Sequence, residues 1–374
     1  MKSSLKTLVN LLDGPVLVTG HTGFKGTWLT FLLEELGVEV VGYSLPPQAD
    51  SLYDRTMRQG KIVEEFRDIR DLNSIHAFIQ RTEPSAVIHL AAQPLVIDSY
   101  KAPLETFETN VMGTVNTLEA SFKLKEIKAF IAITTDKVYR NDNAGTAFTE
   151  GDALAGKDPY SSSKVGSEAA IAAWQEISKS FGGPKVVAAR AGNVIGGGDW
   201  AQNRLIPDLM RGFSRGEVVQ VRNPSSTRPW QHVLDPLLGY LYSLQEVLSG
   251  GNIESINFGP TEPSLTVAEV VEIASRCWGK SADVVLKPSM ETLYEANKLD
   301  LNSGLARELL DWKPVWTQAR AVETTTEWWK DLFLKKISPL DLCKRDIMHA
   351  LEKTASLEQD GIGHNNILAR PQLS

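Results

Sequence analysis

The chain has 374 residues, a hydrophobic fraction of 42% and a formal net charge of −7, so it can bury a core as one large domain or two. The negative charge argues against a general nucleic-acid binder, and two cysteines with six scattered histidines predict no metal or redox site. With no signal-like segment and no apolar run of membrane-spanning length, we expect a cytoplasmic protein with no membrane partner.

Five short apolar runs each end in small or polar residues, which is the pattern of buried strands. They span residues 15–20, 38–43, 86–91, 129–135 and 185–190. Helical stretches separate them, most clearly 104–122, where apolar residues recur at three- and four-residue spacing. This alternation predicts an α/β fold with a Rossmann-type, doubly wound parallel sheet, and we expect residues 1–192 to form most of it.

The second half of the chain has a different character. After about residue 192 the alternation fades, and Gly, Pro, Trp and Arg become more frequent. A strand-like segment at 252–258 and helices near 266–278 and 317–333 predict a smaller mixed α/β lobe over 193–355, with some segments returning to the first domain. Residues 356–374 are polar without a core pattern, so we expect a flexible tail there.

The first motif, VLVTGHTGFKG, places three glycines between a predicted strand and a predicted helix. Glycines there permit a tight turn and the close approach of a pyrophosphate, whose charge is favoured at a helix N-terminus. Helix–strand packing also selects glycine, but the flanking strand and apolar helix favour dinucleotide binding. The GxxGxxG spacing resembles the short-chain dehydrogenase/reductase superfamily. We expect cofactor contacts from Gly20, Thr22, Gly23, Phe24, Lys25 and Gly26.

Further cofactor contacts are expected after the next strands. Ser44 ends the second strand, where an acidic residue would bind the adenosine ribose, and no arginine stands beside it. The residues alone therefore leave NAD and NADP open. The resemblance adds contacts from FRDIRD to the adenine and from HLAAQ to the middle of the cofactor, namely Asp68, Ile69, Ala91, Ala92 and Gln93. Tight packing is the alternative explanation of the two alanines.

The motif DPYSSSK places Tyr160 and Lys164 four residues apart, on one face of a predicted helix. A free tyrosine has a pKa of about 10, and a neighbouring ammonium lowers that pKa because it stabilises the phenolate. A solvated helix face could also carry this pair, but the glycine turn and TTDKVY upstream favour an active site. In the superfamily Thr135 completes the set, and Tyr160 and Lys164 also contact the cofactor. The expected chemistry is hydride transfer at a secondary alcohol.

Residues of the second half indicate what the alcohol belongs to. ARAGNVIGGGDW, NRLIPD and SSTRPWQHVLD bring five candidates into one region, namely Asn193, Arg204, Arg228, Trp230 and His232. Arginine forks suit a pyrophosphate, and aromatic faces suit a base. Each arginine alone could be an ordinary surface residue, but together with the fold they predict a nucleotide-linked substrate.

Taken together, the motifs resemble the CDP-glucose 4,6-dehydratases, which are extended short-chain dehydrogenase/reductases. GNVIGGGDW and RPWQHV are the most discriminating stretches, and the similarity covers roughly residues 15–240, with a weaker part to about 314. The resemblance implies NAD as cofactor, CDP-glucose as substrate, and a place in deoxysugar and polysaccharide biosynthesis.

The resemblance also implies a homodimer. Helices 104–122 and 160–177 would pair across a two-fold axis as a four-helix bundle. Small side chains would permit the close approach, namely Gly166, Ala169, Ala170 and Ala173. The alternative is that these residues pack on the chain's own sheet.

The implied reaction is redox-neutral. Tyr160 would take the proton of the sugar 4-hydroxyl while NAD takes the C4 hydride. Loss of the C5 proton and the C6 hydroxyl would release water, and the hydride would return to C6. The product would be CDP-4-keto-6-deoxy-D-glucose.

TTDKVY departs from the related dehydratases, which carry Asp-Glu where this chain has Asp136 and Lys137. In those relatives the Asp is the acid for the departing hydroxyl, and the Glu is the base at C5. To act as a base near pH 7, Lys137 needs its pKa lowered by about 3 units, or roughly 4–5 kcal/mol. Three roles stay open for Lys137: the C5 base, a positioning or enolate-stabilising cation, or a plain ion pair with Asp136.

Three other functions remain open. An epimerase or reductase on the same scaffold would use the same Tyr160 and Lys164 without loss of water. A non-catalytic dinucleotide-binding regulator would bind cofactor without turnover, although it has no need of the full Thr135, Tyr160 and Lys164 set. A structural or interaction protein explains the fold but none of these motifs.

Overall fold

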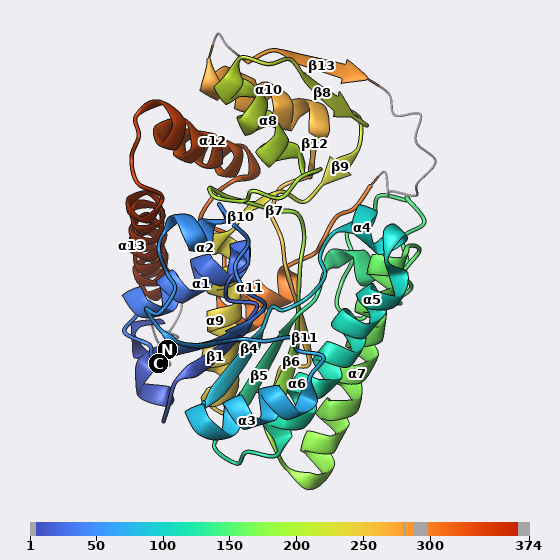
Figure 1. Ribbon diagram of the computed structural model, residues 1–374, viewed down its shortest axis with the longest axis vertical. Coiled ribbons are helices and arrows are strands. Elements are labelled where there is room, and N and C mark those ends of the chain that lie inside the picture. Colours follow the sequence, from blue (N-terminus) through green and yellow to red (C-terminus); the bar gives the residue numbers. More distant parts are fainter. Residues whose placement is uncertain (1–4, 280–281, 288–297, 366–374) are drawn as a thin grey trace, which may run out of the picture.

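Seven parallel strands form the central sheet, in the order β11-β6-β5-β4-β1-β2-β3. The computed structural model describes residues 5–279, 282–287 and 298–365 (Figure 1). The strands are β1 (Val16–Thr19), β2 (Val40–Ser44), β3 (Val63–Phe66), β4 (Ala86–His89), β5 (Ala129–Ile133), β6 (Lys185–Ala191) and β11 (Ser255–Phe258). All five predicted strands of the first half are present. β11, from the second half of the chain, pairs with β6 at one edge.

Residues of each strand alternate between two buried cores, one on each face of the sheet. Val16 and Val18 belong to the larger core, whereas Leu17 between them belongs to the smaller one. The same alternation holds in β5, where Ile131 faces the larger core and Phe130 the smaller. A parallel sheet buried on both faces confirms the predicted α/β fold with a Rossmann-type, doubly wound sheet.

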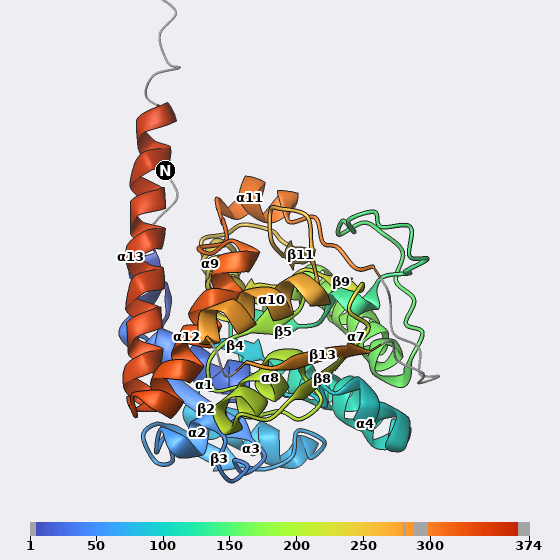
Figure 2. The same cartoon turned by 90° about the horizontal axis from the view of Figure 1, so that it is seen from above.

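Helices cover both faces of this sheet (Figures 1 and 2). The smaller core lies under α3 (Leu72–Thr82), α6 (Gly113–Phe122) and α7 (Pro159–Phe181). The larger core lies under η1 (Leu5–Leu11), α1 (Phe24–Glu35) and α9 (Leu234–Leu248). Shorter helical segments are α2 (Leu52–Arg55), α4 (Val96–Lys101), η3 (Asp136–Val138) and α11 (Gly304–Leu310).

The helix predicted over 104–122 is present but contains a π-helical turn. It consists of α5 (Pro103–Phe107), the π turn η2 (Glu108–Met112) and α6. The turn buries Asn110, whose Oδ1 accepts the Gln93 N–H at 2.8 Å and whose Nδ2 donates to Ser163 Oγ at 2.9 Å. Such π turns occur frequently at functional sites, and the apolar period alone does not reveal them.

The smaller lobe, at the top of Figure 1, combines helices with short strand pairs. Its helices are α8 (Leu205–Arg215), α10 (Val267–Trp278) and α12 (Gln318–Leu334). Its strand pairs are β7 (Val194–Ile195) with β10 (Gln231–His232), β8 (Val219–Arg222) with β13 (Val284–Lys287), and β9 (Thr227–Arg228) with β12 (Leu265–Thr266). The predicted mixed α/β character of this lobe is confirmed.

The last helix, α13 (Pro339–Asn365), differs from the predicted tail. Its first turns bury Leu342 and Ile347 in the larger core, against α1 and α12. Figure 2 shows the helix continuing past the rest of the described chain. Residues 356–365, predicted as tail, are helical, because they continue a helix whose first turns are anchored in the core. Residues 366–374 lie outside the described residues.

Candidate functional site

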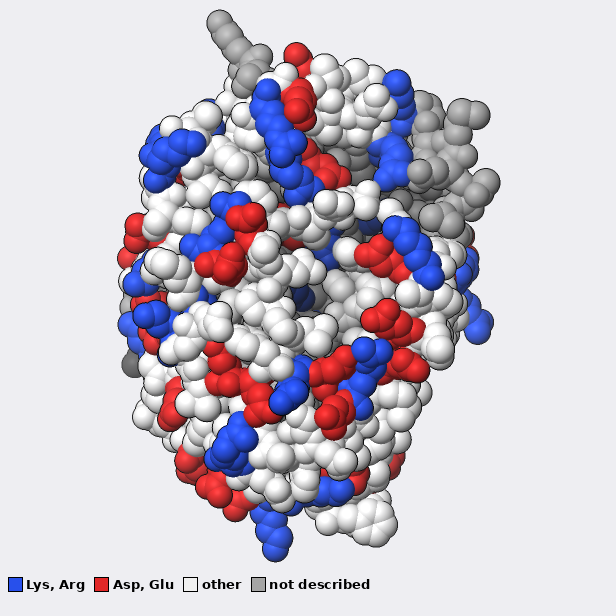
Figure 3. Space-filling model, viewed as in Figure 1, with Lys and Arg blue, Asp and Glu red and all other residues white. Residues whose placement is uncertain are grey.

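A cavity of about 680 Å³ opens between the carboxyl ends of the parallel strands and the smaller lobe. Figure 3 shows its mouth as a hollow near the centre of the molecule. Residues that follow β1, β2, β4 and β5 line one side, and residues of α8 and β8 line the other. Its volume is within the range of small-molecule sites, and its place is where doubly wound sheets bind ligands.

The turn between β1 and α1 is built to receive a diphosphate. Gly20 has a φ of +72°, and a Cβ there would lie 2.8 Å from the backbone nitrogen of Ala91. A Cβ at Gly26 would lie 2.1 Å from the carbonyl oxygen of Gly20. No side chain caps α1 at Gly23, so its first N–H groups are available to an anion. The residues therefore fit the pyrophosphate of a dinucleotide.

The cavity brings together the predicted cofactor residues with one exception. Its lining includes Gly20, Thr22, Gly23, Phe24, Lys25, Gly26, Ser44, Asp68, Ile69, Ala91 and Ala92. The hydroxyls of Ser44 and Thr22 share a hydrogen bond of 2.7 Å. Ser44 is the residue at the end of β2 that stands where an acidic residue would bind the adenosine ribose. Asp68 is held by Arg70, whose Nη2 lies 2.7 Å from its carboxylate.

Gln93 is the exception and does not line the cavity. Its side-chain amide instead joins the loop before α4 to α5. Nε2 donates to the Leu95 carbonyl at 3.1 Å and to Thr106 Oγ at 3.0 Å. The cofactor contact of Gln93 therefore stays a prediction that the cavity lining does not support. The hydrogen-bond donors of its side-chain amide are satisfied by a backbone carbonyl and by a hydroxyl of α5.

Lys25 is unusual in this cavity because it is a partly buried lysine beside other cationic side chains. Its Nζ donates to the Tyr240 hydroxyl at 2.8 Å. Burial, with the nearby charges of Lys164 and Arg204, lowers the pKa of Lys25 to about 7, and Asp136 opposes the shift. An anionic ligand in this cavity would favour its charged form.

The start of α7 places Tyr160 and Lys164. Asp158 caps the helix, because its carboxylate accepts the Ser161 N–H at 2.9 Å. In return, the Ser161 hydroxyl oxygen accepts the Asp158 N–H at 3.1 Å. Pro159 follows at the first helical position, where its fixed φ suits the helix. Tyr160 and Lys164 then share one face and both line the cavity.

The acid–base balance of this pair is set mainly by burial. Burial raises the pKa of Tyr160 to about 12, while a hydrogen bond with Thr135 opposes the rise. Burial lowers the pKa of Lys164 to about 8, against the carboxylate of Glu168, which raises it. The lowering of the Tyr160 pKa expected from Lys164 is not seen. Lys164 Nζ donates to the Ile133 carbonyl at 3.1 Å, at the end of β5.

Asp136 and Lys137 follow β5 in a single turn of 3-10 helix. Thr135 caps this turn, and its hydroxyl donates to Asp136 Oδ1 at 2.9 Å. Asp136 is 2% exposed and its Oδ2 has no partner; burial raises its pKa, although the charge of Lys137 opposes the shift. Lys137 Nζ lies 5.9 Å from the centre of the Tyr160 ring. Within the described residues, no ion pair joins Asp136 and Lys137. The plain ion pair between them, which was one of the three alternatives, is therefore absent.

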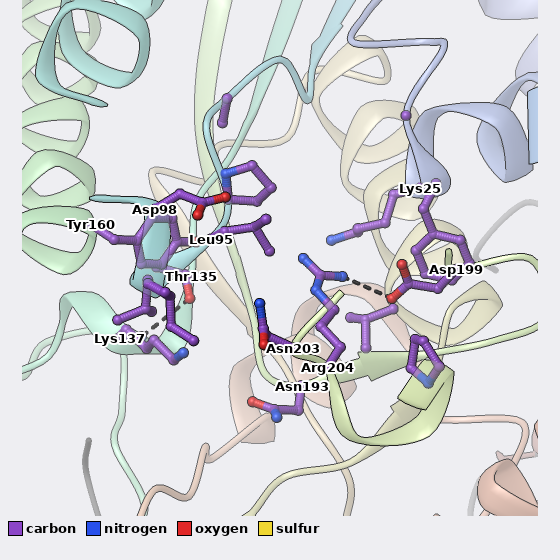
Figure 4. Close-up of a pocket in the computed structure, with 18 of the residues that line it drawn as sticks. Lys25, Leu95, Asp98, Thr135, Lys137, Tyr160, Asn193, Asp199, Asn203 and Arg204 are labelled. Carbon is purple, nitrogen blue, oxygen red and sulfur yellow. Dashed lines mark hydrogen bonds and ion pairs between the residues drawn. The ribbon is translucent and has the colours of Figure 1, made fainter. Parts of the chain in front are cut away.

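Four of the five predicted substrate residues line the cavity, namely Asn193, Arg204, Arg228 and Trp230. Figure 4 shows Asn193 and Arg204 facing Tyr160, Thr135 and Lys137 across the opening. Arg204 forms an ion pair of 3.0 Å with Asp199.

His232 is the fifth, and it does not line the cavity. The side chain is fully buried, and its ring centre lies 4.2 Å from that of Trp316 and 6.1 Å from that of Trp28. Its Nδ1 accepts the Leu234 N–H at 3.4 Å, and burial lowers its pKa to about 3. A neutral histidine between two tryptophans is a core residue.

The sequence reasoning missed several lining residues that Figure 4 labels, namely Leu95, Asp98, Asp199 and Asn203. Asp199 and Asn203 lie within or beside GGGDW and NRLIPD, so those motifs could have revealed them. Asp98 had no motif signal, because it belongs to α4, a short helix after β4.

Comparison with known proteins gives the family. The model of the NAD dependent epimerase/dehydratase family matches residues 16–259. The chain belongs to this family. Membership confirms the enzyme class and the expected NAD cofactor, which the turn at Gly20 and Gly26 fits.

Among curated members of this epimerase/dehydratase family, CDP-glucose 4,6-dehydratase of Salmonella typhimurium is 39% identical over 351 residues, or 91% of this chain and 96% of that protein. The dTDP-glucose 4,6-dehydratase of the same organism is 27% identical over 84% of this chain and 92% of its own. The predicted resemblance to the CDP-glucose 4,6-dehydratases is therefore confirmed, and NAD-dependent nucleotide-sugar dehydration is supported by homology.

Solved structures of the epimerase/dehydratase family share the fold. UDP-glucose 4-epimerase of Thermotoga maritima with UDP-glucose has a TM-score of 0.75 at 23% identity, covering 85% of this chain and 99% of that one. dTDP-glucose 4,6-dehydratase of Bacillus anthracis in complex with NAD has a TM-score of 0.72 at 23% identity, covering 85% and 97%. Across the described part of this chain, no helix is both long and apolar enough to cross a membrane.

Proposed function

We propose that this protein dehydrates CDP-D-glucose to CDP-4-keto-6-deoxy-D-glucose with NAD. The observation that carries the proposal is the placement of Asp136 and Lys137 beside Tyr160 in one cavity. Oxidation at C4 needs only one base, whereas loss of water needs a second acid–base pair. The 39% identity to a CDP-glucose 4,6-dehydratase supports the same assignment.

Tyr160 is the base for the first step. Its phenolate form, hydrogen-bonded to Thr135, would take the proton of the sugar 4-hydroxyl and become the phenol. The ammonium of Lys164 would favour that phenolate before the proton is transferred. When bound along the glycine turn, NAD supplies a hydride acceptor for C4 and a donor for C6. Because the pKa of Tyr160 is raised to about 12, the cationic side chains around the cavity must assist its ionisation.

Asp136 and Lys137 serve the second step. Burial raises the pKa of Asp136, so a protonated carboxyl can give its proton to the departing C6 hydroxyl. Its unpartnered Oδ2 leaves an oxygen available for that contact. Lys137, in its neutral form, would take the C5 proton, which the C4 ketone has made acidic.

The smaller lobe would hold the nucleotide. Arg204 and Arg228 line the cavity, and their guanidinium groups suit the substrate pyrophosphate. Trp230 adds an aromatic face to the same wall. The product, a 4-keto-6-deoxy sugar nucleotide, suits deoxysugar and polysaccharide biosynthesis in the cytoplasm.

A homodimer through α5, η2, α6 and α7 is the proposed assembly. This side of the molecule exposes large apolar side chains, namely Leu104, Phe107, Met112, Ile177 and Phe181. Ala169 and Ala173 of α7 are exposed beside them, whereas Gly166 contacts Val111 of the same chain. Exposed apolar residues gathered on adjacent helices are typical of an interaction surface.

The test is incubation of the purified protein with NAD and each of CDP-, dTDP-, GDP- and UDP-glucose, followed by mass spectrometry. Loss of one water from CDP-glucose alone is the expected result. Conversion of another nucleotide sugar would keep the mechanism and overturn the specificity. No loss of water from any of the four, with or without sugar inversion, would overturn the dehydratase assignment.

A further inference from the structure

Behind the cavity, a buried network joins α7 to the loop that follows β5. Glu168 of α7 and Arg190 of β6 form a forked ion pair, with Arg190 Nε and Nη2 at 2.8 and 2.7 Å from the carboxylate oxygens. Both side chains are 5% exposed. The Thr134 hydroxyl donates to Glu168 at 2.5 Å, and Arg190 Nη1 donates to the Tyr139 hydroxyl at 2.9 Å.

The network holds both ends of the loop that carries the second acid–base pair. Thr134 precedes Asp136 and Lys137 and is tied to Glu168, whereas Tyr139 follows them and is tied to Arg190. Tyr139 is further fixed by its own donation to Asn257 Oδ1 at 2.7 Å, on β11.

Glu168 also shares a helix face with the first catalytic pair. Tyr160, Lys164 and Glu168 follow one another at four-residue spacing on α7, so their side chains lie along one side. The Glu168 carboxylate is therefore about one helical turn from Lys164, and it accepts a hydrogen bond from Thr134, which precedes the loop of Asp136. None of the steps proposed above uses it.

We propose that Glu168 is a positioning residue for this reaction. Its carboxylate maintains the positive charge of Lys164, and through Arg190 and Thr134 it fixes the loop that carries Asp136 and Lys137. The inference rests on the proposed function only for the catalytic roles of Lys164, Asp136 and Lys137.

The charges around Lys164 agree with this role. Lys25 of α1 and the phenol of Tyr160 face the same cavity, and His89 of β4 lies close enough to feel the Lys164 charge. Burial lowers the pKa of His89 to about 3, so it is neutral. In the described chain, Glu168 is the carboxylate that raises the Lys164 pKa against burial. Without it the ammonium would lose its proton at lower pH.

The variant Glu168→Gln keeps the shape and an acceptor for Arg190 but removes the charge. The expected result is a shift of the alkaline limb of the kcat profile toward lower pH by on the order of one unit, or about tenfold lower kcat on that limb. KM for the nucleotide sugar should stay near the wild-type value. The matched control is Glu150→Gln, since Glu150 accepts the Asn257 N–H at 2.8 Å in the same network without bordering Lys164.

Further variants separate charge from shape. Glu168→Asp, which retains the carboxylate, should restore the alkaline limb. If Glu168→Gln does not fold because Arg190 is left as an unpaired buried charge, the double variant E168Q/R190Q removes that charge and should show the same shift. An unchanged alkaline limb in either charge-removing variant, or an equal shift in Glu150→Gln, would overturn the proposal.

The assay uses whichever nucleotide sugar the wild-type protein converts. An error in the assigned nucleotide or product therefore changes the substrate supplied but leaves the test of Glu168 intact.

Discussion

In the proposed mechanism, Lys137 is the residue that distinguishes dehydration from simple oxidation. Its Nζ lies 5.9 Å from the centre of the Tyr160 ring, near enough for both to act on adjacent carbons of one sugar. Asp136 beside it is buried and forms no ion pair with it. The burial of Asp136 and its unpartnered Oδ2 agree with the proposed acid–base roles better than with a surface ion pair.

The substitution Lys137→Met should separate the two steps. It keeps a chain of similar length but removes the amine, so C4 oxidation should persist while water loss falls by about 10²–10⁴-fold. Reduced-cofactor absorbance reports the first step, and mass spectrometry the second. The control is Lys123→Met, an exposed lysine paired with Glu119 on α6. Wild-type dehydration by Lys137→Met would remove Lys137 from the mechanism.

Single residues could be predicted where a local motif dictates their role. The spacing of the glycines predicts the turn, because a tight turn beside a diphosphate needs residues without a side chain. The four-residue spacing of Tyr160 and Lys164 predicts the pair, because it places both side chains on one helix face. Gln93 and His232 could not be placed in this way, since tertiary neighbours decide where their side chains point. His232 is held between tryptophans far apart in sequence.

At the scale of elements, the cap of α7 links stability to the site. Asp158→Ala removes a side-chain acceptor and should cost about 0.5–2 kcal/mol in the free energy of unfolding. It should also lower kcat, because Tyr160 is two residues away. Thr266→Ala removes the equivalent capping box of α10 and should cost a similar free energy without loss of kcat. Denaturant titration and steady-state kinetics check both. Equal effects on kcat would show that the α7 cap has no special link to the site.

The start of α9 contains a buried acid whose protonation changes on unfolding. Asp235 is fully buried and accepts the Val315 N–H at 2.6 Å, and burial raises its pKa to about 8. Between about pH 4 and 8 the folded state keeps a proton that the unfolded chain releases, so this group makes stability fall as pH rises.

Asp235→Asn should therefore remove part of the loss of stability toward pH 8. The expected result is a smaller difference in unfolding free energy between pH 5.5 and pH 8 than in wild type, on the order of a few kcal/mol at most. Urea titrations at the two pH values measure it. An unchanged pH dependence would show that Asp235 is ionised in the folded protein.

Helices and strands could be predicted where the period of the apolar residues and the length of the segment indicate the same type of element. The strands of the parallel sheet read as apolar runs because both faces are buried. The π turn at Glu108–Met112 and the continuation of α13 were not predicted, since the first depends on Asn110 contacting a distant loop and the second on anchoring by the core.

At the scale of the whole molecule, the exposed apolar residues of α5, η2 and α7 predict a dimer. Met112→Asp, which places a charge on a side chain that is 50% exposed, should weaken dimerisation by at least about 2 kcal/mol. Light scattering after size-exclusion chromatography measures the mass. The control is Leu334→Asp, at a comparably exposed residue of α12. A dimer that survives Met112→Asp would place the interface elsewhere.

The most direct test of the account is the fate of the C4 hydrogen. CDP-glucose carrying deuterium at C4 is incubated with the protein and NAD, and the product is examined by mass spectrometry. We expect loss of one water with the deuterium retained at C6, because one cofactor molecule would serve both redox steps in the same cavity. A product that has lost water without deuterium at C6, or an inverted sugar that has lost no water, would contradict it.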